Sequence, residues 1–194
     1  FPAGLENAID IQAETALKLG MRATLTRGSM SLSQDDGGLP PRSVVQTEKE
    51  ILNDSERLIK TWHQQDANGL LEVALAPCSP FSVTQDIMKA SADLAARYGV
   101  GLHTHLAETE DENNFCLKMF GQRPLDYLDT VGWLNDRTWL AHGIHFNDEE
   151  VQRLGAAGTG ICHCPSSNMV LASGIARVKE LRAAGSPVGL GVDG

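Results

Sequence analysis

Short apolar runs alternate with longer amphipathic stretches along the whole chain, and the alternation occurs six times. Nearly continuous apolar runs of this length are typical of parallel strands that are covered on both faces. The runs are 21–26, 70–76, 100–107, 138–142, 158–164 and 187–193. The pattern therefore predicts six strands that lie in a parallel sheet.

The stretches between these runs carry the signals of helix ends. Gly20, Gly99 and Gly185 each follow a stretch of helical spacing, which is the usual position of a helix-terminating glycine. Asn147 precedes acidic residues and is a good N-cap. The predicted helices are 6–19, 47–65, 84–98, 148–157 and 175–184, with 113–131 divided into two shorter helices at Gly121 and Pro124.

This strict alternation predicts right-handed βαβ units, and hence an α/β fold. Periodicity alone leaves open whether the sheet is an open, doubly wound sheet or a barrel. No Gly-x-Gly-x-x-Gly motif follows a predicted strand, which argues against a dinucleotide-binding sheet. Polar residues gather where several strands end, which is where (β/α)8 barrel enzymes keep their chemistry. We expect one domain, 1–194, that forms an incomplete TIM-type barrel of about six βα units.

The net charge and the lack of long apolar runs argue against two classes of partner for this chain. Sixteen basic and 25 acidic residues give a net charge of −9, which disfavours a nucleic-acid partner but leaves a free nucleobase in a buried pocket possible. No apolar run approaches the length of a membrane span, so we expect no membrane partner. The four cysteines lack the spacing of a disulfide framework, which indicates reduced thiols and a cytoplasmic protein.

The strongest chemical motif lies at the end of the third predicted strand, in His103-Thr-His105-Leu-Ala-Glu108. Residues two apart in a strand share a face, so His103 and His105 point the same way. Neutral imidazole suits zinc or iron, and a nearby carboxylate suits proton transfer. The alternative is a pair of hydrogen-bonded core histidines with a helix-capping glutamate.

Two further motifs end other strands. His142 closes the fourth run, in LAHGIH, and Asp193 closes the sixth, in GLGVDG. Each is weak evidence alone, because an isolated histidine is commonly structural and Asp-Gly is ordinary turn chemistry. Together with His105 and Glu108 they place metal- or proton-competent side chains at the same end of one sheet, which favours a catalytic site.

Two more residues are candidates for substrate contact. Arg27 ends the first predicted strand, where its guanidinium could bind a ring carbonyl or pair with Asp35 or Asp36. Cys78 ends the second strand, either as a core thiol or as a substrate contact. The polar segment 29–42 is either a disordered loop or an active-site lid.

Cys162-His163-Cys164 is not expected to bind zinc, because a structural zinc site needs four ligands and no second pair follows. We expect the residues after it, 165–168, to form a loop over the pocket. The chain also does not match the unrelated zinc deaminases of nucleosides and nucleic acids. Those enzymes carry His-x-Glu with Pro-Cys-x-x-Cys, and the stretch at Cys78 lacks the second cysteine.

The ordered motifs HTHLAETE, LAHGIHF, HCPSSNMVLASGI and GLGVDG resemble the amidohydrolase superfamily, within the branch of guanine, S-adenosylhomocysteine and s-triazine deaminases and hydrolases. The resemblance covers essentially the whole chain. The stretches TRGSMSLS and APCSPFSVT are most similar to those of 8-oxoguanine deaminases and of relatives called hydroxyatrazine hydrolases.

The resemblance implies a role for each site residue. His105 is then a metal ligand, Glu108 the proton shuttle, His142 the residue that holds water or substrate, and Asp193 both a metal ligand and the general base. It also implies one divalent ion, zinc or alternatively iron, and a homo-oligomeric full-length protein. Members of the family carry a further His-x-His pair on the first barrel strand. We find no such pair before the first predicted strand here, so we expect the first two barrel strands to be missing and the chain alone to be inactive.

The resulting hypothesis is a metal-dependent hydrolytic deaminase of a small nitrogen heterocycle, 8-oxoguanine or a related purine, that releases ammonia. Cys78 stands where many deaminases of the branch have histidine, which favours an oxidised purine over methylthioadenosine-type substrates. One alternative is an s-triazine amino- or chlorohydrolase, because attack at an activated ring carbon is common to all of these reactions. The other is a non-catalytic relative that keeps the fold without the metal.

Overall fold

The structure is a computed structural model that describes residues 5, 7–66 and 68–193. The chain divides into two compact units. The first unit consists of residues 1–78 and 82–102. The second consists of the short segment Ser79–Phe81 and the chain from His103 onward. Strand β3 begins in the first unit and ends in the second.

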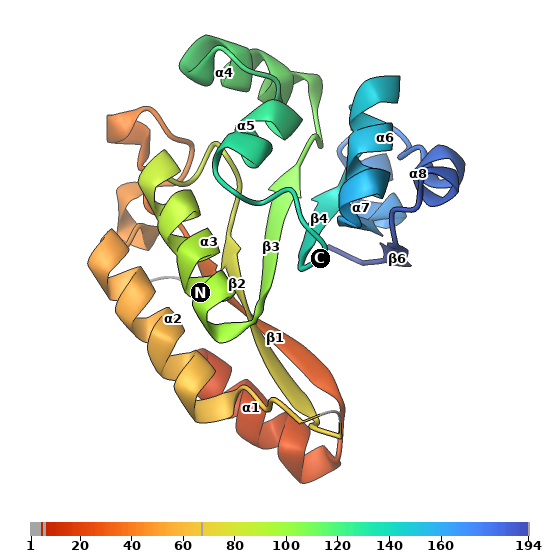
Figure 1. The fold of residues 1–194 in the computed structure, drawn as a ribbon. Coiled ribbons are helices and arrows are strands. Elements are labelled where there is room, and N and C mark those ends of the chain that lie inside the picture. Colours follow the sequence, from red (N-terminus) through yellow and green to blue (C-terminus); the bar gives the residue numbers. More distant parts are fainter. Residues whose placement is uncertain (1–4, 6, 67, 194) are drawn as a thin grey trace. The chain divides into compact units, whose positions relative to one another are not determined.

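The first unit is a small parallel sheet with three α-helices (Figure 1). Strands β1 and β2 pair in register from Ala23 opposite Leu71 to Ser29 opposite Pro77, and Ala74 of β2 pairs with Gly101 at the start of β3. Its elements are α1 (Ala8–Leu19), β1 (Ala23–Ser29), η1 (Gln34–Asp36), η2 (Arg42–Val44), α2 (Glu48–Trp62), β2 (Leu71–Pro77), α3 (Gln85–Tyr98) and the start of β3 (Gly101–Leu106).

Local sequence explains these elements. Helix α2 begins with a capping box in which the Thr47 side chain accepts from the Glu50 amide and the Glu50 carboxylate accepts from the Thr47 amide. Strand β2 is buried at almost every position, as its continuous apolar run predicts. Helix α1 packs on β1 and β2 through Ala13, Ala16 and Leu71, whose small and branched side chains allow a close approach.

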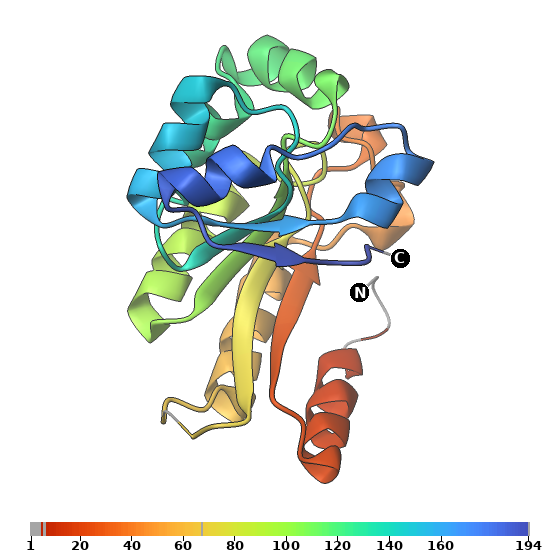
Figure 2. The ribbon, with the colours of Figure 1, turned by 90° about the vertical axis from the view of Figure 1, so that its right-hand side faces the viewer.

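The second unit continues the same alternation (Figure 2). Strand β4 pairs in parallel with β5, and β5 with β6. Helices α6 and α8 pack together where Gly155 lies against the backbone of Ala184, and no larger residue fits at position 155. Its further elements are α4 (Glu110–Phe120), α5 (Pro124–Thr130), β4 (Thr138–His142), α6 (Asp148–Ala157), β5 (Gly160–His163), α7 (Pro165–Val170), α8 (Val178–Ala184) and β6 (Val188–Leu190).

The predicted α/β fold with parallel strands is confirmed, and the bounds of β4 and α6 coincide with the predicted ranges. Several expectations are wrong. The first strand is Ala23–Ser29 rather than 21–26, the last strand ends at Leu190 rather than at 193, and the last helix starts at Val178 rather than at 175. The segment 165–168 is not a loop but most of helix α7, and the helix expected to start at 113 starts at Glu110. Glu6, the expected start of the first helix, lies outside the described residues. In the described part of the chain, no helix is long and apolar enough to cross a membrane.

Candidate functional site

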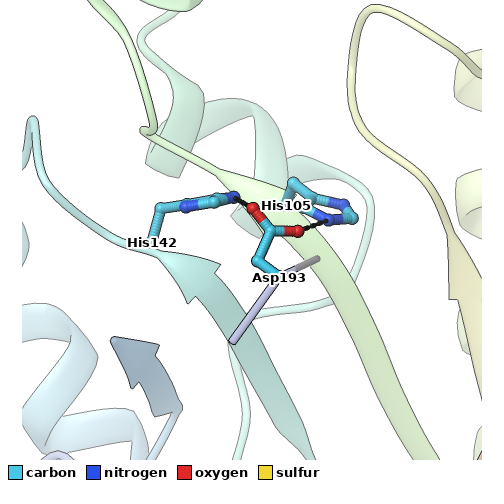
Figure 3. A group of neighbouring side chains, drawn as sticks. All are labelled: His105, His142 and Asp193. Carbon is cyan, nitrogen blue, oxygen red and sulfur yellow. Dashed lines mark ion pairs between the residues drawn. The ribbon is translucent and has the colours of Figure 1, made fainter. Parts of the chain in front are cut away.

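Three side chains of the second unit meet where its strands end (Figure 3). His105 lies near the end of β3, His142 is the last residue of β4, and Asp193 follows β6. The Asp193 carboxylate lies between the two imidazoles: its Oδ1 atom is 3.8 Å from His105 Nε2 and its Oδ2 atom 3.6 Å from His142 Nε2. One nitrogen or oxygen atom from each residue lies within 4.8 Å of the others. The structure thus brings these three predicted residues together.

Glu108 joins this group from the residues just after β3. Its Oε2 atom is 3.6 Å from His142 Nε2, so two carboxylates face the same imidazole nitrogen. His142 is fully buried, whereas the Glu108 side chain is 22% exposed and the Asp193 side chain 31% exposed. A buried base beside partly exposed acids is an arrangement that can exchange protons with a bound molecule.

The spacing of these atoms fits a metal ion better than direct hydrogen bonds. Hydrogen bonds require about 2.7–3.2 Å between heavy atoms, whereas His105 Nε2 and Asp193 Oδ1 are 3.8 Å apart. Two ligands bound tetrahedrally to zinc at ~2.0–2.1 Å stand about 3.4 Å apart. His142 Nε2 is buried and makes no hydrogen bond to any described residue. The residues present therefore fit a divalent ion.

The backbone at this site adopts conformations that L-residues rarely take. Ala107, His142 and Asp193 have positive φ angles of 53°, 70° and 49°, and only Ala172 shares this among the described residues other than glycine. Such backbone costs about 1–3 kcal/mol per residue, persists only where the surrounding structure enforces it, and is concentrated at functional sites. Gly191 contributes to the placement of Asp193, because a Cβ atom at residue 191 would lie 2.6 Å from the Cys162 sulfur.

Glu112, which the sequence did not single out, holds the turn before the helix α4. Its carboxylate accepts from the backbone amides of Ala107 at 2.8 Å and of Glu108 at 3.0 Å. Burial raises the pKa of Glu112 to about 7, although these two amide donors act in the opposite direction. The side chain fixes the peptide that carries Glu108, which lies four residues earlier.

This raised pKa predicts a pH-dependent contribution to stability. In the unfolded chain Glu112 ionises with the ordinary glutamate pKa of 4.5, whereas in the folded chain it does so near 7. The free energy of unfolding therefore falls as pH rises between these values, by up to about 3 kcal/mol. We expect Glu112→Gln to gain stability relative to the wild type from pH 5 to pH 8, measured by urea unfolding of the full-length protein.

Glu50→Gln is the matched control, since Glu50 is also a helix-capping glutamate but Thr47 lowers its pKa. It should show no such gain at pH 8. If the difference in free energy of unfolding between Glu112→Gln and the wild type stays constant from pH 5 to pH 8, Glu112 does not have a raised pKa in the folded protein.

His103 lies beside Trp139 rather than against the Asp193 carboxylate. Its Nδ1 atom is 3.0 Å from the Trp139 carbonyl oxygen and its ring stacks on the Trp139 indole, with centroids 4.9 Å apart. Burial lowers the pKa of His103 to about 4, so the ring is neutral at physiological pH. Of the two histidines that were predicted to share a face, His105 is the one beside Asp193.

Arg27 belongs to the first unit, where it is buried. Its Nε atom donates to Asp54 Oδ2 at 2.7 Å, Nη2 donates to Gln46 Oε1 at 3.0 Å, and Nη1 donates to the Gly28 carbonyl. These bonds use three of the five N–H groups of a guanidinium, which leaves two for another acceptor. The role in substrate binding stays a prediction.

Asp35 and Asp36, the alternative partners of Arg27, bind other groups. Asp35 lies 3.7 Å from Arg42, and Asp36 accepts from the Ser33 hydroxyl at 2.7 Å. The segment 29–42 that contains them is held by backbone bonds from residues 31 and 32 to the Ser82 carbonyl. Its role as a lid stays a prediction.

Cys78, the other residue predicted to contact substrate, also lies in the first unit. It is half-buried and forms no disulfide, and its amide donates to the Ser29 carbonyl at 3.0 Å. Cys162 and Cys164 are likewise reduced, and the Cys164 thiol donates to the Cys162 carbonyl. Burial raises the pKa of Cys164 to about 11, which leaves its thiol protonated at neutral pH.

Two contacts that helix α7 makes with the site are not evident from the sequence. The Ser167 hydroxyl donates to Asp193 Oδ2 at 2.6 Å, and Asn168 Oδ1 lies 2.9 Å from His142 Nδ1. The only signal in the sequence is a polar segment directly after a strand, a pattern that is equally typical of a loop.

Comparison with known proteins agrees with this geometry. The amidohydrolase family matches the chain over residues 2–194. The chain belongs to the amidohydrolase family. The predicted resemblance is therefore confirmed, and the parallel sheet is part of the TIM-type barrel of that family.

Individual amidohydrolases match over nearly the whole chain. It is 68% identical to an 8-oxoguanine deaminase of Pseudomonas aeruginosa strain PAO1, over 100% of this chain and 43% of that protein. It is 35% identical to hydroxydechloroatrazine ethylaminohydrolase of Pseudomonas sp. strain ADP, over 96% of this chain and 38% of that protein. The chain thus spans less than half the length of these relatives.

A solved amidohydrolase structure shows the same fold with metal bound. Atrazine chlorohydrolase from Arthrobacter aurescens TC1, complexed with zinc, matches with a TM-score of 0.92 at 31% identity, over 97% of this chain and 41% of that one. A zinc complex in a relative agrees with a metal site beside His105 and Asp193, which supply an imidazole and a carboxylate.

Proposed function

We propose that the full-length protein is a metal-dependent hydrolytic deaminase of 8-oxoguanine or a related oxidised purine, which releases ammonia. The observation that carries the proposal is the convergence of His105, His142 and Asp193 within 4.8 Å, with Glu108 3.6 Å from His142. The 68% identity to an 8-oxoguanine deaminase supports the choice of substrate.

His105 and Asp193 are the proposed metal ligands in this chain. A neutral imidazole and a carboxylate are donors that zinc accepts, and iron accepts them as well. A divalent ion at this position would supply Lewis acidity, which makes water a nucleophile at neutral pH.

Asp193 and Glu108 are the proposed proton-transfer groups of this chain, and His142 positions the water. Asp193 accepts the proton of the attacking water, and His142 orients that water from its buried position. Glu108, which is partly exposed and lies on the same side of His142, protonates the ring nitrogen next to the carbon under attack. This proton neutralises the developing charge. Asp193 then passes the proton that it took from the water to the exocyclic amine, and the carbon–nitrogen bond breaks to release ammonia. General acid–base groups placed in this way contribute about 10²–10⁴-fold each.

Two residues of the first unit are proposed to contact the substrate. Arg27 has two N–H groups left for a ring carbonyl oxygen, which an oxidised purine provides. The half-buried Cys78 is the second proposed contact to this ligand.

Ammonia release by the full-length protein tests the proposed function. A panel of 8-oxoguanine, guanine, isocytosine and hydroxyatrazine should give turnover with 8-oxoguanine at a kcat/KM at least about tenfold above the others, a difference of about 1.4 kcal/mol in transition-state binding. No ammonia from any of the four compounds would contradict a deaminase of this class.

A second candidate is an s-triazine amino- or chlorohydrolase, which the 35% identity to an ethylaminohydrolase of a dechlorinated atrazine favours. Release of alkylamine or chloride, assayed beside ammonia, separates this reaction from purine deamination. A non-catalytic relative, the candidate of another class, would release none of the three products.

Four further properties complete the proposal. We propose that the chain belongs to a single barrel domain, that the full-length protein is a cytoplasmic homo-oligomer, and that its partner is a small heterocycle rather than nucleic acid or a membrane. The acidic net charge of −9 supports the exclusion of nucleic acid.

A further inference from the structure

Two consecutive residues of α7 reach two different members of the candidate site. Ser167 donates to Asp193 Oδ2 at 2.6 Å, and the next residue, Asn168, places its carboxamide oxygen 2.9 Å from His142 Nδ1. Asn168 and His142 are buried, with 2% and 0% of their surface exposed. A buried contact of this kind between side chains far apart in sequence is costly to lose, because each group would lose its hydrogen bond without access to water.

The chemistry of this contact determines where the imidazole carries its proton. A carboxamide oxygen can only accept, so His142 Nδ1 must donate. A neutral imidazole with its proton on Nδ1 has a lone pair on Nε2, and this atom faces Glu108 and Asp193 at 3.6 Å. The same ring in the other tautomer would present an N–H to the site and would repel a cation there.

The backbone of α7 holds these side chains in place. The helix begins at Pro165, one residue beyond the end of β5, and the Asn168 amide donates to the Cys164 carbonyl at 3.0 Å. The Ser173 amide donates back to the Asn168 carbonyl at 2.9 Å, so Asn168 is bonded on both sides of its peptide. Residues 167 and 168 are therefore fixed by the same turn of helix.

We propose that Ser167 and Asn168 are positioning residues of the deaminase site: Asn168 fixes His142 as the Nδ1–H tautomer with its Nε2 lone pair toward the reacting water, and Ser167 fixes the Asp193 carboxylate. The proposal rests on the proposed function for its kinetic consequence. Its structural consequence, the tautomer of His142, is independent of any substrate.

Nitrogen NMR of the zinc-loaded full-length protein, labelled in its histidine rings, tests the tautomer. The signals of His142 are assigned by their loss in His142→Gln. We expect a protonated Nδ1 and an unprotonated Nε2 in the wild type, loss of this fixed state in Asn168→Leu, and its retention in Asn168→Asp, which keeps the acceptor. A wild-type His142 with its proton on Nε2 would overturn the proposal.

Steady-state kinetics on 8-oxoguanine tests the positioning role. Loss of an outer hydrogen-bond partner of this kind costs about 10- to 100-fold in activity. We expect Asn168→Leu to lower kcat by that factor with KM changed by less than about twofold, and Asn168→Asp to recover most of the loss. Ser167→Ala should lower kcat by about tenfold, within the range for such partners.

Two matched controls separate positioning from general destabilisation. Asn113→Leu replaces another buried asparagine of the second unit, whose Oδ1 atom has no partner among the described residues. Ser166→Ala changes an exposed serine of the same helix. Both should keep the wild-type kcat and the His142 signals. If Asn113→Leu loses as much activity as Asn168→Leu, or if Asn168→Leu keeps both the tautomer and the kcat, the proposal is wrong.

The two proposals fail in different ways. If the full-length protein releases no ammonia from any of the compounds, the proposed deaminase activity is wrong. The NMR experiment still decides whether Asn168 fixes the tautomer of His142. If the wild type is active and Asn168→Leu is equally active with the same tautomer, the deaminase proposal stands and the positioning role of Asn168 is wrong.

Discussion

Glu108→Gln in the full-length protein is expected to lower kcat for 8-oxoguanine by about 10²–10⁴-fold, the usual contribution of a general acid–base group. Glutamine keeps the shape of the side chain but supplies no proton at the ring nitrogen. The metal content should not change, because Glu108 is not among the proposed ligands. Its contact to His142 Nε2, at 3.6 Å, is too long to be a hydrogen bond that holds the site together.

Glu110→Gln is the matched control for this variant. Glu110 lies two residues further along and its side chain is 80% exposed, so it should keep the wild-type kcat. Metal content by elemental analysis and ammonia release are measured on the same samples. A Glu108→Gln protein with near-normal turnover would exclude the role of proton shuttle.

Asp193→Asn should have an effect at least as large, because it removes a metal ligand and the general base together. We expect kcat to fall by at least about 10³-fold and bound zinc to fall well below one per chain. The asparagine can still accept from Ser167, so the local fold of this segment is retained. This combination of lost metal and retained fold distinguishes Asp193 from Glu108.

Asp111→Asn, an exposed aspartate of α4, controls for the loss of one negative charge in the same unit. It should retain zinc and turnover. If Asp193→Asn binds stoichiometric zinc and turns over normally, Asp193 is neither ligand nor base.

The fold was predictable because its signals are local. Continuous apolar runs and terminal glycines such as Gly20 and Gly99 mark where strands and helices lie, and both glycines adopt the left-handed conformation that ends a helix. Helix α7 was not predictable in this way. It has six residues, begins with a proline, and is too short for its sequence to show a helical period.

The candidate site was predictable in part for a topological reason. The carboxyl ends of neighbouring parallel strands meet at one edge of a sheet, so polar residues that end β3, β4 and β6 fall close together. The contacts that orient them depend on side-chain packing between distant segments. Asn168 is 26 residues from His142, and the partner of Arg27 is Asp54, 27 residues away rather than in the next loop.

The placement of the metal is the claim on which the chemistry depends. Anomalous diffraction at the zinc edge, from crystals of the full-length protein, measures it directly. We expect one strong peak at ~2.0–2.2 Å from both His105 Nε2 and a carboxylate oxygen of Asp193. A zinc-containing protein whose peak lies away from these two atoms would contradict it.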